Sequence, residues 1–415
     1  MRIPDRMLQG SFLSNLTSVK ESMNKIQEKI VTRSKVNRPS DNPLANSRIM
    51  RLNSQIENLQ TYNSNIEKGL SKIENTITSM DNIHNEVQNV LTNLTNAMNP
   101  SIGGNITTIG KSVELSLKSI VDQANAEFNG EYLFGGTDFS SEPYSYATDG
   151  SGIQRNIEDL SGEHKIRLTN NVFQKINMSG RDLFQPVLNL GGNVDSTGGV
   201  GSSQSTTEDV WDADGNKYTA TVTYTMTAAN TYDMEISVTD STSAEIYNDT
   251  KELLFNATSG ELESIDGGDP DDIRIQISAN KIDFLLNTDS VLENDSTSVL
   301  RSDLNQKADI FNTLFSIKEK LLAGELPTAD QVEILKNFDS HVLNKMSEMG
   351  NIQNRLTDTQ DMLTTQDSEL QNLLSSEKDV DVAKAVIEMQ NYDYSLQMAY
   401  KISAMILPKS LLEFL

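Results

Sequence analysis

The stretch that decides the fold is residues 49–98, IMRLNSQIENLQTYNSNIEKGLSKIENTITSMDNIHNEVQNVLTNLTNAM. Its apolar side chains recur every three or four positions, which is the period of one face of an α-helix. The members of this stripe are Ile49, Leu52, Ile56, Leu59, Tyr62, Ile66, Leu70, Ile73, Ile77, Met80, Ile83, Val87, Leu91, Leu94 and Met98. About 50 residues at 1.5 Å each form a helix of roughly 75 Å. Because the repeat is close to seven, this helix is predicted to pack in a coiled coil.

Helical stripes also occupy both ends of the chain. The N-terminal stripe consists of Leu8, Phe12, Leu16, Val19, Met23, Ile26 and Ile30. The C-terminal stripe contains Leu396, Ala399, Ile402 and Ile406, and apolar residues continue through Leu411, Leu412 and Leu415. Pro408 is predicted to end the last helix, because proline lacks the backbone N–H that continues it.

The C-terminal half mirrors the long helix. A helix is predicted to begin at Leu304, and a heptad-like series follows from Val332 to Leu374 after a turn around Gly324. Polar Gln360 and Asp367 interrupt this series, so looser packing is expected there.

The middle of the chain has a different period. Gly, Ser, Thr and Asp become frequent, and apolar residues alternate with polar ones over 218–226, 232–238 and 273–277. This period of two predicts antiparallel strands with one solvated face. The fold class is therefore mainly α with an inserted β-rich domain, and the N- and C-terminal helices are predicted to pack into a long coiled-coil rod.

Three domains are predicted from these changes of pattern. The terminal helical polymerisation core comprises residues 1–45 and 385–415. The helical rod domain comprises 46–137 and 286–384, and the outer β-rich insert comprises 138–285.

The net charge of −25 restricts the partners. It argues against nucleic acid, because phosphate binding needs a basic surface. The charge is uneven: residues 186–300 hold 4 Lys or Arg against 21 Asp or Glu, whereas residues 1–60 hold 10 against 5. No cysteine is present, and neither a signal peptide nor a membrane span is expected.

No pattern points to catalysis or to a cofactor. His84, His164 and His341 lack metal-ligand spacing and are expected to be solvated. The segment Asp212–Asn216 resembles half of a calcium loop, but Thr223 stands where the bidentate acid is needed, so a hairpin turn is predicted instead. The chain is therefore not expected to be an enzyme.

The apolar ends are the informative surfaces. One interpretation is that the two terminal stripes bury only each other within one chain. The alternative is that they stay partly exposed and bury against neighbouring copies during assembly, which makes them a polymerisation interface.

Short motifs at both ends resemble the flagellin family. The segment from Ile30 to Ala45, IVTRSKVNRPSDNPLA, is similar to the N-terminal signature of that family, and either Ser40 or Asp41 is expected to cap the long helix, with Pro43 in its first turn. Asn354-Arg355-Leu356 resembles the family's element on the returning helix. The sequence departs from the family at Arg33-Ser34-Lys35, where Thr-Gly-Lys is usual.

Within the family, two segments favour the branch that joins hook to filament over a minor filament flagellin. They are Ser40-Asp41-Asn42-Pro43 and the stretch NGEYLFGG at 129–136. This resemblance implies self-association in a ring of the flagellar axis, next to a neighbouring hook-associated protein and flagellin. It also implies a secreted, extracellular location after export by the flagellar type III apparatus, and an export chaperone on the C-terminal helix. An enzyme carried on the insert and a type III effector are the alternatives from other classes.

Overall fold

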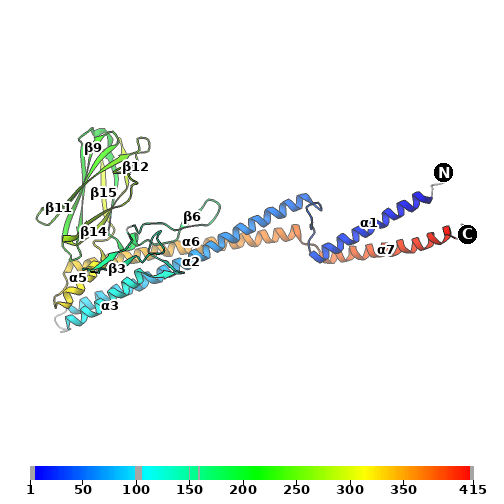
Figure 1. The fold of residues 1–415 in the computed structure, drawn as a ribbon, viewed down its shortest axis with the longest axis horizontal. Helices are drawn as coiled ribbons and strands as arrows, with labels where there is room; N and C mark the ends of the chain where they lie inside the picture. The colour runs from blue at the N-terminus through cyan, green and yellow to red at the C-terminus, as the bar shows by residue number, and fades with distance from the viewer. Residues whose placement is uncertain (1–4, 99–104, 149, 158, 412–415) are drawn as a thin grey trace. The chain divides into compact units, whose positions relative to one another are not determined.

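The computed structural model describes residues 5–98, 105–148, 150–157 and 159–411 (Figure 1). Chain contacts divide it into two units, residues 1–65 with 358–415 and residues 66–357. The helices of the described residues are α1 (Asp5–Thr32), α2 (Pro43–Ala97), α3 (Ile106–Ala124), α4 (Gly180–Phe184), α5 (Ile310–Leu322), α6 (Ala329–Lys378) and α7 (Val382–Leu411). Helices α2 and α6 each contribute to both units.

The predicted long helix is confirmed as α2. In the larger unit, five of its side chains spaced by seven positions are fully shielded from solvent: Ile66, Ile73, Met80, Val87 and Leu94. A repeat of seven keeps these residues on one seam of the helix. The residues predicted to stop this helix, Asn99 to Gly104, lie outside the described residues.

Helix α6 carries a matching seam in the same unit. Leu335, Val342, Met349 and Leu356 are again spaced by seven and are fully buried. Asp339 of α6 joins the two helices, because its carboxylate lies 2.7 Å from His84 Nδ1 and accepts a hydrogen bond of 2.6 Å from Gln88 Nε2. Both helices therefore carry the heptad-spaced buried seam that the coiled-coil prediction requires. Gly324 (φ +85°) lies at the predicted turn before α6.

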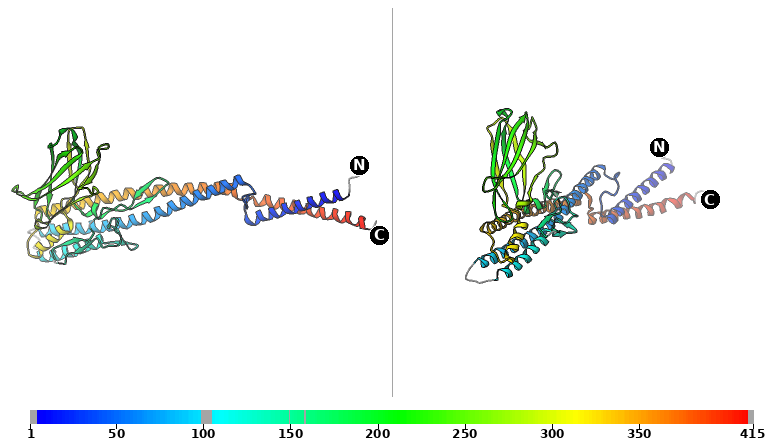
Figure 2. Two further views of the ribbon diagram at one scale, coloured as in Figure 1. Left: turned by 45° about the horizontal axis from the view of Figure 1, so that its top comes forward. Right: turned by 60° about the vertical axis from the view of Figure 1, so that its left-hand side comes forward.

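A β-sandwich occupies the middle of the chain (Figures 1 and 2). One sheet has the order β12-β11-β10-β9-β8 and the other β13-β14-β7-β15. Its strands are β7 (Val187–Asp195), β8 (Ser203–Trp211), β9 (Lys217–Ala228), β10 (Thr231–Thr239), β11 (Glu245–Phe255), β12 (Leu262–Ile265), β13 (Ile273–Ile277), β14 (Ile282–Asn294) and β15 (Val299–Leu304). Their inward side chains form one apolar core that includes Tyr224, Tyr232 and Phe255.

Among the described residues, three short hairpins lie outside the sandwich. They are β1 (Glu127–Phe128) with β2 (Glu131–Tyr132), β3 (Tyr144–Tyr146) with β4 (Ile153–Arg155), and β5 (Lys165–Arg167) with β6 (Phe173–Lys175). Gly69 of α2 gives the last hairpin room to approach, because a Cβ there would lie 2.8 Å from Ile166 Cδ1.

The predicted strands are confirmed where the alternation is clean. Along β9 and β10 every second side chain is buried, and the turn between them places Asn230 in the left-handed region at φ +58°. Asn tolerates that conformation better than most residues. The hairpin predicted at Asp212–Asn216 is also present, because Asp212 Oδ1 accepts hydrogen bonds from the amides of Asp214 and Asn216.

The predicted end of the insert at residue 285 is wrong. Strand β14 runs through that position to Asn294, and β15 ends at Leu304, where a helix was expected to begin. The register shifts between Asn287 and Ser290, and such a bulge breaks the alternation that marks a strand in sequence. Strands β14 and β7 are moreover parallel, so the sandwich is not wholly antiparallel. Helix α5 begins only after its N-cap, Asp309.

Two further expectations were wrong. Helix α7 continues to Leu411 and so includes Pro408. The proline removes one backbone hydrogen bond close to the end of the helix, and only three helical residues follow it. The histidines are not simply solvated: His341 is 9% exposed with Nε2 2.8 Å from the Asp182 oxygen, and His164 Nδ1 lies 3.2 Å from the buried Lys72 Nζ. Burial lowers the pKa of both histidines.

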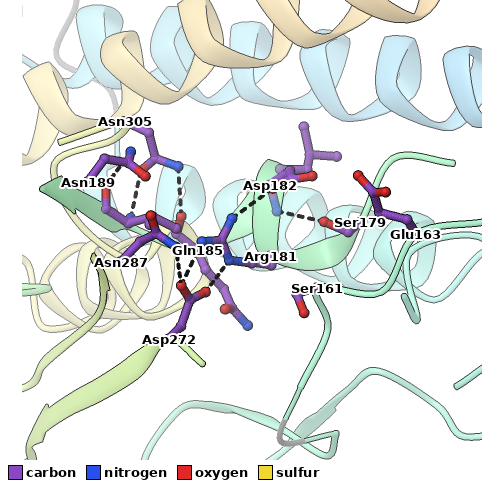
Figure 3. A network of polar contacts seen from close by, with 12 residues as sticks. Ser161, Glu163, Ser179, Arg181, Asp182, Gln185, Asn189, Asp272, Asn287 and Asn305 are labelled. Carbon is purple, nitrogen blue, oxygen red and sulfur yellow. Dashed lines mark hydrogen bonds and ion pairs between the residues drawn. The ribbon is translucent and has the colours of Figure 1, made fainter. Parts of the chain in front are cut away.

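A polar network links the sandwich to helix α4 and to the segments that enter and leave the sandwich (Figure 3). Arg181 of α4 forms an ion pair with Asp272, the residue before β13, with Nη2 2.8 Å from Oδ1. Asn287 of β14 donates to the same carboxylate. Asn305 spans the connection, because its side chain accepts from the Val187 amide and donates to the Gln185 oxygen. Both chain segments that enter the sandwich are therefore held together.

Candidate assembly surface

Helices α1 and α7 contact each other along the predicted terminal stripes. On α1, the stripe residues Phe12, Leu16, Val19 and Met23 are half-buried and Ile26 is buried; on α7, Leu396 and Ala399 are half-buried. Leu8, Ile406 and Leu411 lie within these helices, and Leu412 and Leu415 lie outside the described residues. Most of the predicted interface with described side chains therefore forms a seam within one chain.

Helix α7 has a second apolar face that sequence analysis missed. Ile387, Tyr394, Met398 and Ile402 are 59%, 69%, 58% and 47% exposed. Their spacing of seven, four and four places them on one side of the helix, away from Leu396. Ile402, which was grouped with the seam, lies on this exposed face instead. The sequence did contain a signal for this second face, because α7 has apolar residues on two sides. One partner helix can cover only one of them.

Helix α1 lacks such a second face among its described side chains. Leu13 is 60% exposed, but Thr17 and Lys20, one and two turns further on, are polar and exposed. Of these two helices, α7 therefore has the larger exposed apolar surface.

A paired break separates the α1–α7 pair from the rest of the smaller unit. The chain leaves α1 at Arg33 and leaves α6 near Lys378, and the two breaks are hydrogen-bonded: Lys35 N donates to the Lys378 oxygen (2.6 Å) and Val380 N donates to the Arg33 oxygen (3.1 Å). Lys35 Nζ also donates to the Ser376 oxygen at 2.8 Å. Arg33 has φ +55°, a strained conformation for a residue with a Cβ.

The signature residues shape this break. Asp41 Oδ2 accepts from the amides of Arg38 (2.9 Å) and Asn37 (3.2 Å), and chiefly the bond from Arg38 lowers the pKa of its carboxyl. The expectation that Ser40 or Asp41 caps α2 is wrong, because Asn42 Oδ1 accepts from the Ala45 amide and performs that role. Pro43 is the first residue of α2, as predicted.

The remaining signature residues lie on α6 in the larger unit. Asn354 and Arg355 are exposed, next to the buried Leu356. Within the described ranges, no group of three or more His, Asp or Glu side chains is arranged to hold a metal ion. None of the described helices combines the length and hydropathy needed to cross a membrane.

Comparison with protein families accounts for both ends of the chain. Residues 3–138 match the bacterial flagellin N-terminal helical region, and residues 333–415 match the bacterial flagellin C-terminal helical region. The chain belongs to the flagellin family. The prediction of a mainly α fold with an inserted β-rich domain is confirmed. Residues 185–340 match a different family, the flagellar basal body protein FlaE D2 domain, which covers the sandwich, α5 and the start of α6.

Solved structures similar to this flagellin-family chain were also found. They include the flagellar junction protein FlgL from Legionella pneumophila, with 14% identity and a TM-score of 0.43 over 81% of this chain and 100% of that chain. A putative flagellar hook-associated protein from Vibrio parahaemolyticus has 11% identity and a TM-score of 0.47 over 82% and 100%. FlgL from Xanthomonas campestris has 17% identity and a TM-score of 0.34 over 77% and 98%. No curated protein matches the chain.

Proposed function

We propose that this flagellin-family chain is a junction protein of the hook-associated protein 3 type, a structural subunit that links the hook of a bacterial flagellum to its filament. The observation that carries the proposal is the combination of two family matches in one chain. Its ends match flagellin, and its middle matches a domain of a flagellar basal body protein. A subunit between two different tubular assemblies needs contacts suited to each, whereas a filament subunit needs only those of the filament.

The exposed face of α7 supports assembly through the chain ends. Tyr394, Met398 and Ile402, each one turn from the next, and Ile387, two turns before them, give an exposed apolar surface to a protein with a net charge of −25. Contiguous exposed apolar patches mark interaction sites, and the occupant proposed here is another axial subunit: a second copy in a ring, or flagellin at the ring's edge. Before assembly the same face needs a cover, which is the role proposed for an export chaperone. We place the assembled protein outside the cell, after export by the flagellar type III apparatus.

A substitution on α7 tests the assembly surface. Met398→Asp leaves the α1–α7 seam intact, so the circular dichroism of the purified chain is expected to stay unchanged. Burial of a Met side chain contributes about 1.5–3 kcal/mol, and a buried unpaired carboxylate adds a further cost. Cells carrying this variant are therefore expected to secrete flagellin without attaching filaments to hooks.

Leu13→Asp on α1 is the matched control, because Leu13 is equally exposed but has no apolar neighbours on its face. Normal filaments with Met398→Asp, or equal loss with Leu13→Asp, contradict the assignment of the α7 face. Immunogold labelling of the wild-type chain separates the functions: a single spot at the hook end supports a junction protein, and label along the filament supports a minor flagellin.

A further inference from the structure

Lys72 of α2 is buried in the larger unit, with a side chain that is only 6% exposed. Its Nζ donates to Glu131 Oε2 of β2 at 3.1 Å and lies 3.2 Å from Nδ1 of His164, in the segment that leads into hairpin β5–β6. The ring of Phe139 covers the same ammonium group, with its centroid 4.7 Å away. A lysine is seldom buried this deeply without partners, so these contacts hold its charge in place.

The contact with Lys72 fixes the protonation state of His164. An ammonium group has three N–H donors and no acceptor, so Nδ1 of the half-buried ring must accept, and the ring is neutral with its proton on Nε2. Burial, and then the charge of Lys72, lower the pKa of His164, and the carboxylate of Glu131 opposes them. The adjacent Glu163 is paired with Lys165 instead. The folded chain therefore favours the neutral ring.

His164 lies where hairpin β5–β6 meets α2 (Figure 1). Gly69 precedes Lys72 by one turn of that helix, and a Cβ at Gly69 would lie 2.8 Å from Ile166 Cδ1 and 3.4 Å from Ile176 Cγ2. The backbone joins the two arms of the hairpin at the same level, because Ile176 N donates to the His164 oxygen at 2.9 Å. The base of the hairpin is therefore held on one turn of α2 by an apolar contact at Gly69 and a polar contact at Lys72.

We propose that the docking of hairpin β5–β6 on α2 is a pH-sensitive switch, in which a proton on His164 Nδ1 releases the base of the hairpin. The proton would place an N–H group beside the Lys72 ammonium, where the acceptor had been. Two donors form no hydrogen bond, and like charges repel more strongly in a protein interior than in water. Lys72 keeps Glu131 as its partner, so the ring moves away and the base of the hairpin moves with it.

The switch operates on the acid side of neutrality. Because the pKa of His164 is lowered from 6.5 while the hairpin is docked, the docked form binds fewer protons than the released form. The free energy that holds the hairpin on α2 is therefore complete above pH 6.5, and it is lost as the pH falls through the lower pKa of the docked form. Val172 and Phe173, which are 41% and 58% exposed at the tip, belong to the segment that is released.

Hydrogen–deuterium exchange of the full chain at pH 7.5 and pH 5.0, followed by mass spectrometry, tests the switch. Protection factors of peptides within 160–178, which correct for the pH dependence of intrinsic exchange, are compared with those of β9 and β10. In the wild type, protection of the hairpin is expected to fall about tenfold more than protection of the strands, which corresponds to a pKa difference of about one unit. Equal changes in the hairpin and the strands overturn the proposal.

Three variants assign the response to the contact. His164→Gln keeps a side-chain acceptor for Lys72 but does not titrate, so its hairpin is expected to stay protected at pH 5.0. Lys72→Met removes the ammonium that conflicts with a protonated ring, so the ratio of its hairpin protection factors at the two pH values is expected to be smaller than in the wild type. His84→Gln removes a different histidine of α2 and is expected to keep the wild-type response. A wild-type response in His164→Gln, or an undiminished one in Lys72→Met, overturns the proposal.

Discussion

Asp309 makes the stability of the larger unit depend on pH in a direction that can be measured. It is the N-cap of α5, where Oδ1 accepts from the Phe311 amide at 3.0 Å and Oδ2 accepts from Asn312 Nδ2 at 2.5 Å. Asn312 in turn holds hairpin β3–β4 through the Ile153 backbone. Burial, and then the carboxylate of Asp283, raise the pKa of Asp309 from 3.8 to about 7.

The sign follows from proton linkage. Between pH 3.8 and about 7 the folded chain holds a proton on Asp309 that the unfolded chain has lost, so raising the pH lowers stability. The contribution of Asp309 to the free energy of unfolding is fully present below its unfolded pKa of 3.8. It is lost as the pH rises through its folded pKa of about 7. For a folded pKa of about 7, the free energy of unfolding falls by about 1.4 kcal/mol between pH 6 and pH 8 from this group alone.

Asp309→Asn removes this titration while keeping a good N-cap. The measurement is urea unfolding followed by Trp211 fluorescence at pH 6 and pH 8, for the wild type and the variant. The variant is needed because His341 also titrates: its pKa is lowered in the folded chain, so its contribution to the free energy of unfolding rises with pH up to its unfolded pKa. Both proteins contain His341, so the difference between them reports Asp309 alone. Wild type is expected to lose about 1.4 kcal/mol more than Asp309→Asn over this interval. An equal pH dependence in both proteins refutes the reasoning.

Three further substitutions test the packing. Leu356→Ala empties a fully buried position on the α6 seam and is expected to lower the free energy of unfolding by about 2–5 kcal/mol, measured by urea denaturation with circular dichroism. Arg33→Gly relieves the positive φ at the helix break and is expected to stabilise the chain by about 1 kcal/mol, seen as slower proteolysis there; faster cleavage counts against it. Arg181→Gln leaves the Asp272 carboxylate partly buried without its cation, so a loss of about 3–5 kcal/mol is expected, and Trp211 fluorescence should report it.

Local sequence determined the elements whose period is strong. The seven-residue repeat of Ile66, Ile73 and Met80 predicts the long helix, because the spacing of apolar residues along one face of a helix is a local property of the sequence. The clean alternation along 218–226 predicts β9 for the same reason. The motifs around Pro43 and Asn354 indicated the flagellin family, and the family comparison bears this out.

Only the tertiary structure decided which surfaces remain free. The stripe containing Leu396 and the face containing Met398 are both apolar in sequence, and the first is half-buried beside α1 while the second stays exposed. The parallel pairing of β14 with β7 and the contact between Lys72 and His164 likewise join residues far apart in the chain. Periodicity specifies how a segment folds on itself, whereas burial and pairing depend on which distant segment lies against it.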